Sequence, residues 1–292
     1  MRGLIRRFPT TSFFILAYAV SWAYWIPMLV TGQRVAPGST TTHFPGLLGP
    51  AIAAILVQAA CQGTAGVRAL WRRAILVSRP AARFWRYSLS PVGFLAAALI
   101  VMLIGGVALP AASEFGRFSG LPELGLPVVI LLVVIFGGFG EELGWRGFAL
   151  ERLQSRFGPL GGALLLAALW AGWHLPAFGI IQTYREMTPP MIVFGFLLGL
   201  TCGSLVLANV ANRTSGSVLA ASLWHATYNL TAATSAGGGF ISGFTTMCVM
   251  VWAVVAVVLE LRRGRRPSLL SVAGPPVQTV VSGHPPAVRR FA

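Results

Sequence analysis

Long apolar segments constrain the fold of this chain more than any other feature of its sequence. Each is about 20 residues long, the length that a helix needs to cross a hydrocarbon core of about 30 Å. Only 10% of the 292 residues are charged, whereas an ordinary soluble domain carries about 25%. We therefore expect an all-α, polytopic membrane protein of about eight transmembrane helices rather than a soluble enzyme. The expected spans are 11–31, 46–62, 91–110, 125–150, 159–179, 190–209, 216–236 and 240–261.

The arginines lie mostly in the connections between these segments, and their number alternates from one connection to the next. Short loops that are rich in arginine stay on the cytoplasmic side of a membrane. The alternation predicts an even number of spans with both termini in the cytoplasm, and the first apolar run is too long for a cleaved signal peptide. The connections expected inside contain Arg2, Arg6, Arg7, Arg68, Arg72, Arg73, Arg79, Arg83, Arg86, Arg152, Arg156, Arg213, Arg262, Arg263, Arg265 and Arg266, and those expected outside hold Arg34, Arg117 and Arg185.

The net charge of +15 does not indicate a nucleic-acid partner, because the arginines are spread over loops as orientation signals rather than gathered on one soluble face. All 22 basic residues are arginine and all 7 acidic residues are glutamate. This bias is typical of GC-rich coding and favours a bacterial inner membrane. The three cysteines, Cys61, Cys202 and Cys248, lie within or beside apolar segments without paired spacing, so the sequence predicts no disulfide framework and no zinc knuckle.

Two features outside the polar clusters carry structural expectations. The connection 63–90 holds aromatic residues among its arginines, so it could lie along the inner headgroup layer as an amphipathic helix or remain a solvated loop. Gly195, Gly199 and Gly203 recur at every fourth position, a pattern that predicts close packing of this helix against a neighbour.

A charged cluster interrupts the segment 125–150 near its expected cytoplasmic end. Placing charged side chains within the bilayer costs free energy, so their presence indicates a functional or structural role. On a helix, Glu142 and Arg146 are four residues apart and can pair, whereas Glu141 points about 100° away, onto the face of Trp145. An ionised, paired Glu142 suits a structural role, and an unpaired Glu141 suits a general base. The alternative is a charged cluster that only anchors the helix at the membrane interface.

Polar residues also occur within two later apolar segments. His174 lies in the segment 159–179, where a single histidine can equally be a satisfied core residue. His225 and Asn229 are four residues apart in the segment 216–236 and share one helix face. Two donors on one face could form a hydrogen-bonded clamp between helices or an oxyanion hole.

A rise of ~1.5 Å per residue places Glu141 and His225 each about 13 Å from the cytoplasmic end of its helix. The same rise places His174 about 22 Å from Pro159, which is deeper than the other two residues. The agreement in depth is therefore partial. One carboxylate, two histidines and an amide nevertheless supply a base, its partner and two donors, the groups that amide hydrolysis requires.

At these residues the chain resembles the CPBP family, the CAAX-protease and bacteriocin-processing (Abi-domain) intramembrane glutamic endopeptidases, over roughly residues 125–232. Three motifs in the family's order and on the expected spans carry the resemblance. They are E-E-x-x-x-R at Glu141, Glu142 and Arg146, an aromatic-x-x-x-H at Trp170 and His174, and H-x-x-x-N at His225 and Asn229.

The resemblance implies an eight-helix α-fold and an intramembrane endopeptidase that needs no metal or other cofactor. It implies that Glu141 and His174 activate a water molecule, while His225 and Asn229 stabilise the tetrahedral oxyanion. Supporting roles fall to Glu142, Arg146 and Trp170, the last of which stands where many relatives have phenylalanine. We expect the chain to divide into 1–124 for the N-terminal helices with a basic loop, 125–236 for the catalytic core and 237–261 for the last helix. Residues 262–292 have no counterpart in the family, and their composition predicts a disordered basic tail.

Three alternative functions remain open from the sequence. One glutamate and two histidines could bind zinc as in a metalloprotease, although the chain has no H-E-x-x-H motif. Buried glutamate and histidine could also relay protons in a transporter, although no inverted repeat is visible. A non-proteolytic immunity or scaffold protein could keep the same fold. The expected partners are the lipid bilayer and a peptide or membrane-protein substrate, and the oligomeric state is open.

Overall fold

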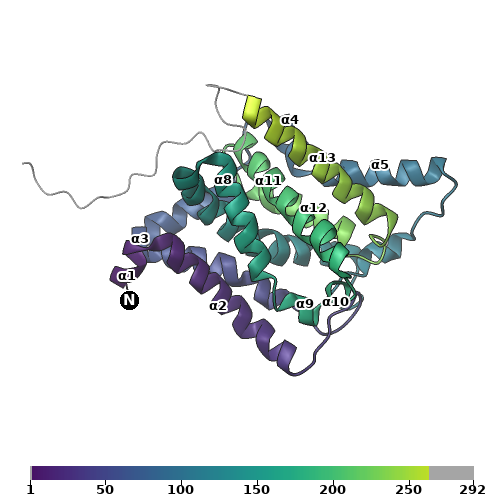
Figure 1. Ribbon diagram of the computed structural model, residues 1–292, viewed down its shortest axis with the longest axis horizontal. Coiled ribbons are helices and arrows are strands. Elements are labelled where there is room, and N and C mark those ends of the chain that lie inside the picture. The colour runs from purple at the N-terminus through teal and green to yellow at the C-terminus, as the bar shows by residue number, and fades with distance from the viewer. Residues whose placement is uncertain (1, 263–292) are drawn as a thin grey trace, which may run out of the picture.

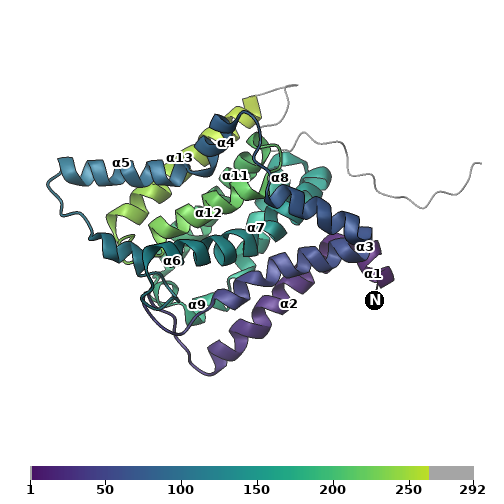
Figure 2. The ribbon, with the colours of Figure 1, turned by 180° about the vertical axis from the view of Figure 1, so that it is seen from behind.

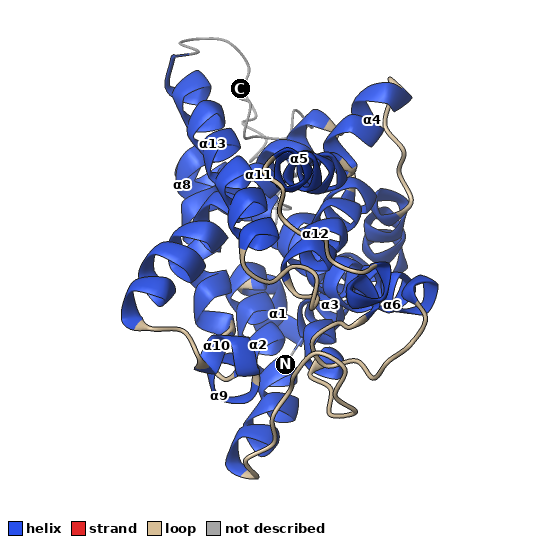
Figure 3. Cartoon of the chain, turned by 90° about the vertical axis from the view of Figure 1, so that its right-hand side faces the viewer, coloured by secondary structure: helices blue, strands red, loops and turns tan. Residues whose placement is uncertain are grey.

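The computed structural model describes residues 2–262, and these residues form helices joined by loops, with no strand among them (Figure 3). The expected tail 262–292 lies outside the described residues except for Arg262. The main helices are α1 (Arg2–Arg7), α2 (Pro9–Val30), α3 (Gly49–Ala74), α4 (Ala81–Ser88), α5 (Ser90–Ile104), α6 (Leu126–Leu132), α7 (Gly140–Gly144), α8 (Leu150–Trp173), α9 (Ala177–Ile180), α10 (Gln182–Arg185), α11 (Leu198–Arg213), α12 (Val218–Ala232) and α13 (Phe240–Arg262). The short elements are the 3₁₀ helices η1 (Phe44–Leu48) and η2 (Ala112–Gly116) and the π-helical turns η3 (Val133–Phe139), η4 (Trp145–Ala149) and η5 (Met191–Leu197).

The helices form one bundle in which α2 and α3 lie on one side and α5 and α13 on the other, with α7, α11 and α12 between them (Figures 1 and 2). Many large apolar side chains on the outer helices are exposed, including Ile15 on α2, Ile104 on α5 and Val251 on α13. An apolar exterior around a polar interior is the arrangement that a lipid environment requires. The chain is a multi-pass, all-α membrane protein, as the sequence predicts.

In the described part of the chain, five helical stretches are long and apolar enough to cross a membrane, or six if α4 and α5, which meet at 55°, form one span. This number is lower than the eight expected spans for two reasons. The segments expected at 125–150 and 159–179 belong to one stretch, Leu126–Trp173, and α12 has only 15 residues. The count of eight crossings remains a prediction.

The stretch Leu126–Trp173 turns back on itself at Gly158. The backbone there has φ 74° and ψ 170°, which is not helical, and glycine adopts such a conformation at no steric cost. A Cβ atom on Gly162 would lie 2.6 Å from the backbone nitrogen of Gln154. In a straight helix eight residues span about 12 Å, so the two arms form a helical hairpin.

The loops gather at two ends of the bundle, and each end collects the loops that the arginine count assigns to one side of the membrane. At one end, Arg73 donates from Nε to the carbonyl of Gly216 (2.8 Å) and pairs with Glu151 (2.9 Å). Arg6 joins this end by donating to the carbonyl of Ala60. Loops that are expected on the cytoplasmic side therefore contact one another.

At the opposite end, backbone hydrogen bonds join the loops that are expected outside. The amide of Val35 donates to the carbonyl of Ile180, the amide of Gly120 to that of Ala36, and the amide of Ser119 to that of Ala233. The partition of the loops agrees with the arginine count. Which end faces the cytoplasm remains a prediction.

The connection 63–90 is partly helical, because α3 continues to Ala74 after a break at Gly63 and α4 occupies Ala81–Ser88. Phe84 is buried against the bundle, whereas Trp71 and Trp85 are about half exposed. The connection is thus neither one amphipathic helix nor a plain loop.

The glycines that permit close helix packing differ from those that the sequence pattern singles out. A Cβ atom on Gly195 or Gly203 would meet nothing within 4 Å, and one on Gly199 would only reach ordinary contact with Thr246. The expectation of a close-packed stripe is therefore wrong at Gly195 and Gly203, and Gly199 makes only an ordinary contact with α13. Close approach occurs instead at Gly138 and Gly144, where a Cβ atom would clash with α12 and α3 respectively.

Candidate active site

The two glutamates of the charged cluster lie on α7 (Figure 2), and Arg146 follows on η4. The π-helical turns η3 and η4 flank α7 on either side. A π-helical turn places one more residue in the turn than an α-helix does, and such turns occur frequently at functional sites. A Cβ atom on Gly138 would lie 2.8 Å from the carbonyl oxygen of Ser222 on α12, and one on Gly144 would lie 2.5 Å from the Cβ of Pro50 on α3. The absence of side chains at these positions lets η3 pack directly against α12 and α7 against α3.

Glu142 binds a guanidinium and an imidazole in the interior of the bundle. Its Oε1 atom accepts from Arg146 Nη1 and from His225 Nδ1, each at 2.8 Å. The predicted i to i+4 pair of Glu142 and Arg146 is confirmed, and all three residues are buried. The guanidinium carbon of Arg146 also lies 4.7 Å from the ring centroid of Trp170, within the range of a cation–π contact.

Glu141 is bound by two indole groups. Its Oε2 atom accepts from Trp170 Nε1 at 2.8 Å and from Trp145 Nε1 at 3.3 Å. Its Oε1 atom accepts no hydrogen bond from the described residues, although the side chain is only 3% exposed. The two neighbouring glutamates therefore have different partners, as the helical spacing predicts: Arg146 for Glu142 and indole groups for Glu141.

Trp170 connects Glu141 to His174. While its indole donates to Glu141, its carbonyl oxygen accepts from His174 Nδ1 at 2.8 Å. A carbonyl oxygen only accepts, so Nδ1 carries the proton and Nε2 keeps its lone pair when the ring is neutral. His174 lies one helical turn, or about 6 Å, beyond Trp170, which agrees in direction with its greater predicted depth.

Aromatic rings and one amide complete the site. The ring of His225 meets Trp170 edge to face at 5.4 Å, and that of His174 lies 5.4 Å from Phe196. The side-chain nitrogen of Asn229 would lie 3.2 Å from a Cβ atom on Gly137, so it faces η3. His174 and Asn229 are partly exposed, whereas Glu141 and His225 are buried, and this difference gives the site an open edge.

Helix α2 holds the end of α8 that carries His174. Trp173 Nε1 donates to Ser21 Oγ at 2.8 Å, and Trp22 Nε1 donates to the carbonyl of Trp173 at 3.0 Å. The Tyr18 hydroxyl donates to the carbonyl of Leu169. Side chains far away in the sequence therefore fix the helix turn on which His174 lies.

Sequence reasoning missed two residues near the site. The ring of Tyr184, on α10, lies 6.5 Å from that of His174. Burial raises the pKa of the Tyr184 phenol, and the nearby groups of Glu141 and Tyr228 raise it further. Burial, reinforced by His174, lowers the pKa of His43 to about 4. No motif or helical spacing links Tyr184 or His43 to the cluster, because both lie on loop elements that only the folded chain brings close.

Among residues 2–262, no group of three or more histidine, cysteine, aspartate or glutamate side chains is arranged to hold a metal ion. The seven residues singled out from the sequence do come together: Glu142, Arg146 and His225 in one cluster, and Glu141, Trp170 and His174 in a second that adjoins it. Asn229, the seventh, lies beside η3 one turn after His225.

Two comparisons with known proteins cover this part of the chain. Residues 123–231 match the family model of type II CAAX prenyl endopeptidase Rce1-like proteins. A curated relative, CAAX prenyl protease 2 of Methanococcus maripaludis, is 28% identical over 147 residues, which are 48% of this chain and 54% of the relative. The alignment thus spans about half of the relative's length. The segment 123–231, which contains all three motifs, is thus similar to the CAAX prenyl endopeptidases.

Proposed function

We propose that this protein is a CAAX-type intramembrane endopeptidase, which hydrolyses a peptide bond with a water molecule activated by Glu141 and His174. One observation carries the proposal: Trp170 binds Glu141 with its side chain and His174 with its carbonyl group. One tryptophan thus holds both the carboxylate and the imidazole that the proposal requires. It also occupies Oε2 of Glu141 and Nδ1 of His174, which leaves Oε1 and Nε2 available for water.

Water bound between Oε1 and Nε2 is the proposed nucleophile. As its oxygen bonds to the substrate carbonyl carbon, one proton passes to Glu141. When the C–N bond breaks, Glu141 returns that proton to the leaving nitrogen. No step in this sequence requires a metal ion or an organic cofactor.

His225 and Asn229 are the proposed donors to the oxyanion. Nδ1 of His225 donates to Glu142, so only Nε2 can reach the substrate, and it donates when the ring is protonated. A protonated His225, together with Arg146, balances the charges of the two glutamates. The cluster is then neutral before the reaction and presents a positive group to the developing negative charge.

The expected substrate is a peptide or membrane protein that enters the site from the bilayer, in a cell membrane that the composition suggests is bacterial. The curated relative is named a CAAX prenyl protease. A bacterial host for this chain argues against a prenylated substrate. Both kinds of peptide therefore belong in the test.

The direct test uses the full chain reconstituted in bilayers with farnesylated and unmodified CAAX peptides, in water enriched in ¹⁸O. We expect a shortened peptide whose new carboxylate contains ¹⁸O. Glu141→Gln should lower turnover by at least about 10²-fold, the usual contribution of a general base. Glu123→Gln is the matched control, because Glu123 forms an exposed ion pair with Arg117 far from the cluster. Full activity in Glu141→Gln would refute the mechanism.

Stripping with a strong chelator distinguishes the proposed chemistry from that of a zinc enzyme. The stripped protein should keep its activity, with elemental analysis as the check on metal content. A zinc protease would instead need Glu141, His174 and His225 as ligands. Activity that disappears on stripping and returns with zinc would reassign these three residues.

A further inference from the structure

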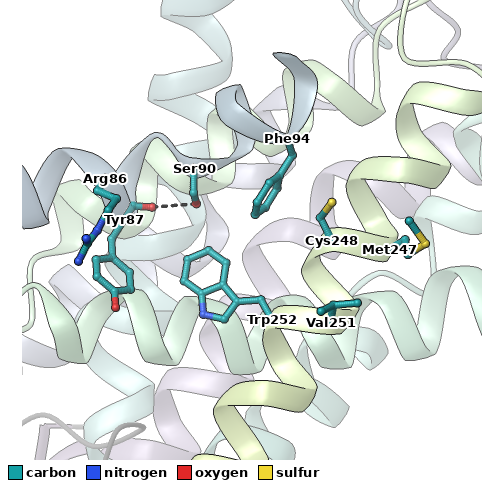
Figure 4. A pocket seen from close by; sticks show the side chains of 8 residues that line it. All are labelled: Arg86, Tyr87, Ser90, Phe94, Met247, Cys248, Val251 and Trp252. Atoms are coloured by element: carbon teal, nitrogen blue, oxygen red, sulfur yellow. Dashed lines mark hydrogen bonds between the residues drawn. The ribbon is translucent and has the colours of Figure 1, made fainter. Parts of the chain in front are cut away.

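A cavity of about 490 Å³ lies between α5 and α13, away from the glutamate cluster. Its volume is in the range of about 300–1,000 Å³ that is usual for small-molecule sites. Figure 4 shows Arg86 at one end of its lining and Met247 at the other, with aromatic rings between them. The lining residues are Arg86, Tyr87, Ser90, Phe94, Met247, Cys248, Val251 and Trp252.

The cavity is apolar along most of its length. The rings of Tyr87 and Phe94 lie 5.7 Å and 6.3 Å from that of Trp252, so the three rings form a continuous wall. Met247 and Val251, one turn apart on α13, are 52% and 58% exposed. Since the outer face of α13 is apolar, the cavity opens sideways toward the hydrocarbon of the membrane.

The polar groups of the lining lie near a single end. Ser90 Oγ is already engaged, because it donates to the carbonyl of Tyr87 and accepts from Trp224 Nε1. Arg86 is exposed, lies 5.6 Å from the ring centroid of Tyr87 and forms no ion pair with a carboxylate of the described residues. The lining therefore offers one free positive charge beside an apolar channel.

We propose that this cavity binds a membrane phospholipid with an anionic headgroup, the acyl chain lying along α13 and the headgroup at Arg86. An amphiphile with one negative end matches both the single cation and the apolar wall. Basic pockets between transmembrane helices bind anionic headgroups for the same reason. The proposal concerns a site separate from Glu141 and does not depend on proteolytic activity.

The test is photo-crosslinking in nanodiscs of phosphatidylcholine that contain a small fraction of phosphatidylglycerol with a photoreactive acyl chain. Mass spectrometry should locate adducts on the peptide that contains residues 247–252. A phosphatidylcholine analogue with the same photoreactive chain should give a lower yield there. Equal yields from the two lipids would overturn the assignment of an anionic headgroup.

Two pairs of variants complete the test. Arg86→Gln should lower the phosphatidylglycerol adduct about five-fold, which corresponds to roughly 1 kcal/mol for one interfacial charge, whereas Arg72→Gln, at an exposed arginine of α3 outside the cavity, should not. Cys248→Trp should fill the cavity and remove the adduct, whereas Val255→Trp, on the exposed face of α13, should leave it.

Arg86 is exposed, so its variant keeps the test decisive even if Cys248→Trp folds poorly. An unchanged yield in Arg86→Gln would overturn the proposal. Displacement of the photoreactive lipid by a farnesylated peptide would also overturn it, because the cavity would then bind a substrate's lipid chain.

Discussion

Glu142 contacts Arg146 and His225, and its loss should affect the stability of the protein more than the loss of Glu141. Glu142→Gln leaves Arg146 buried without a counter-charge, a change that costs about 3–5 kcal/mol when a buried pair is broken. Glu141→Gln removes a carboxylate that is bound only by neutral indoles. We expect a clearly lower melting temperature in detergent for Glu142→Gln and a nearly unchanged one for Glu141→Gln. Equal melting temperatures would contradict the assigned division of roles.

The ring of Tyr184 lies 6.5 Å from that of His174, and we expect its hydroxyl to reach the substrate. Because burial raises the pKa of its phenol, the hydroxyl stays protonated at neutral pH and can donate to the reacting groups. Tyr184→Phe should lower kcat about 10- to 100-fold with little change in KM, the loss of one hydrogen bond to a charged group at roughly 1.5–3 kcal/mol. Tyr24→Phe is the control, since the Tyr24 hydroxyl bonds the exposed loop at Thr42. Identical kcat values for both variants would remove Tyr184 from the mechanism.

The partners of single residues were predictable only within one helix. The i to i+4 spacing correctly predicts the pair of Glu142 and Arg146 and the separate face of Glu141. The same reasoning leaves open whether His225 is a clamp or an oxyanion donor, and the structure shows its Nδ1 bound to Glu142. That contact depends on how α12 docks against α7, and no local pattern in the sequence records the docking.

At the scale of elements, close contact between η3 and α12 brings His225 to the glutamates. Gly138→Ala places a methyl group 2.8 Å from the backbone oxygen of Ser222, so α12 must shift. Overpacking of this kind costs about 1–3 kcal/mol, and a displacement of ~1 Å can reduce activity about 10²-fold. We expect a lower melting temperature in thermal unfolding and a lower turnover in peptide-cleavage assays.

Gly93→Ala is the control for this prediction, because a methyl group on Gly93 in α5 meets nothing within 4 Å. Alanine favours a helix by up to about 1 kcal/mol relative to glycine, so this variant should be as stable as the natural chain or more stable. A Gly138→Ala protein with natural activity would show that α12 tolerates the shift.

The lengths of the apolar segments and the positions of the arginines predicted where the helices and loops lie. They did not predict the π-helical turns or the glycines at which helices approach closely. The π-helical turns η3 and η4 lie within one apolar stretch, where composition shows no change of pitch. The regular spacing of Gly195, Gly199 and Gly203 suggested close packing, but of these three positions only Gly199 has a neighbour within 4 Å of an added Cβ atom. Close approach at Gly138 and Gly144 depends on the neighbours that the fold supplies, and spacing along one helix does not contain that information.

For the whole molecule, the two loop ends lead to a test of orientation. Arg73 contacts the loops near Glu151 and Gly216, so these three regions lie on one side. Reporter fusions after Arg73 and Arg156 should report the cytoplasm, and fusions at Pro122 and Thr188 the opposite side. A cytoplasmic signal at Pro122 would contradict the assigned orientation, and the bundle would then lie inverted in the membrane.

The pair formed by Glu142 and Arg146 has a consequence for the insertion of the protein into the membrane during synthesis. Both charges lie on the same helical hairpin, four residues apart, so they neutralise each other without help from any later helix. A charged residue alone in the bilayer costs about 2.5–3.5 kcal/mol on insertion scales. The hairpin can therefore leave the translocon while α12 is still being synthesised, and His225 joins a charge pair that is already in place. Glu142 and Arg146 can thus enter the bilayer as a pair before α12, which carries His225, has been synthesised.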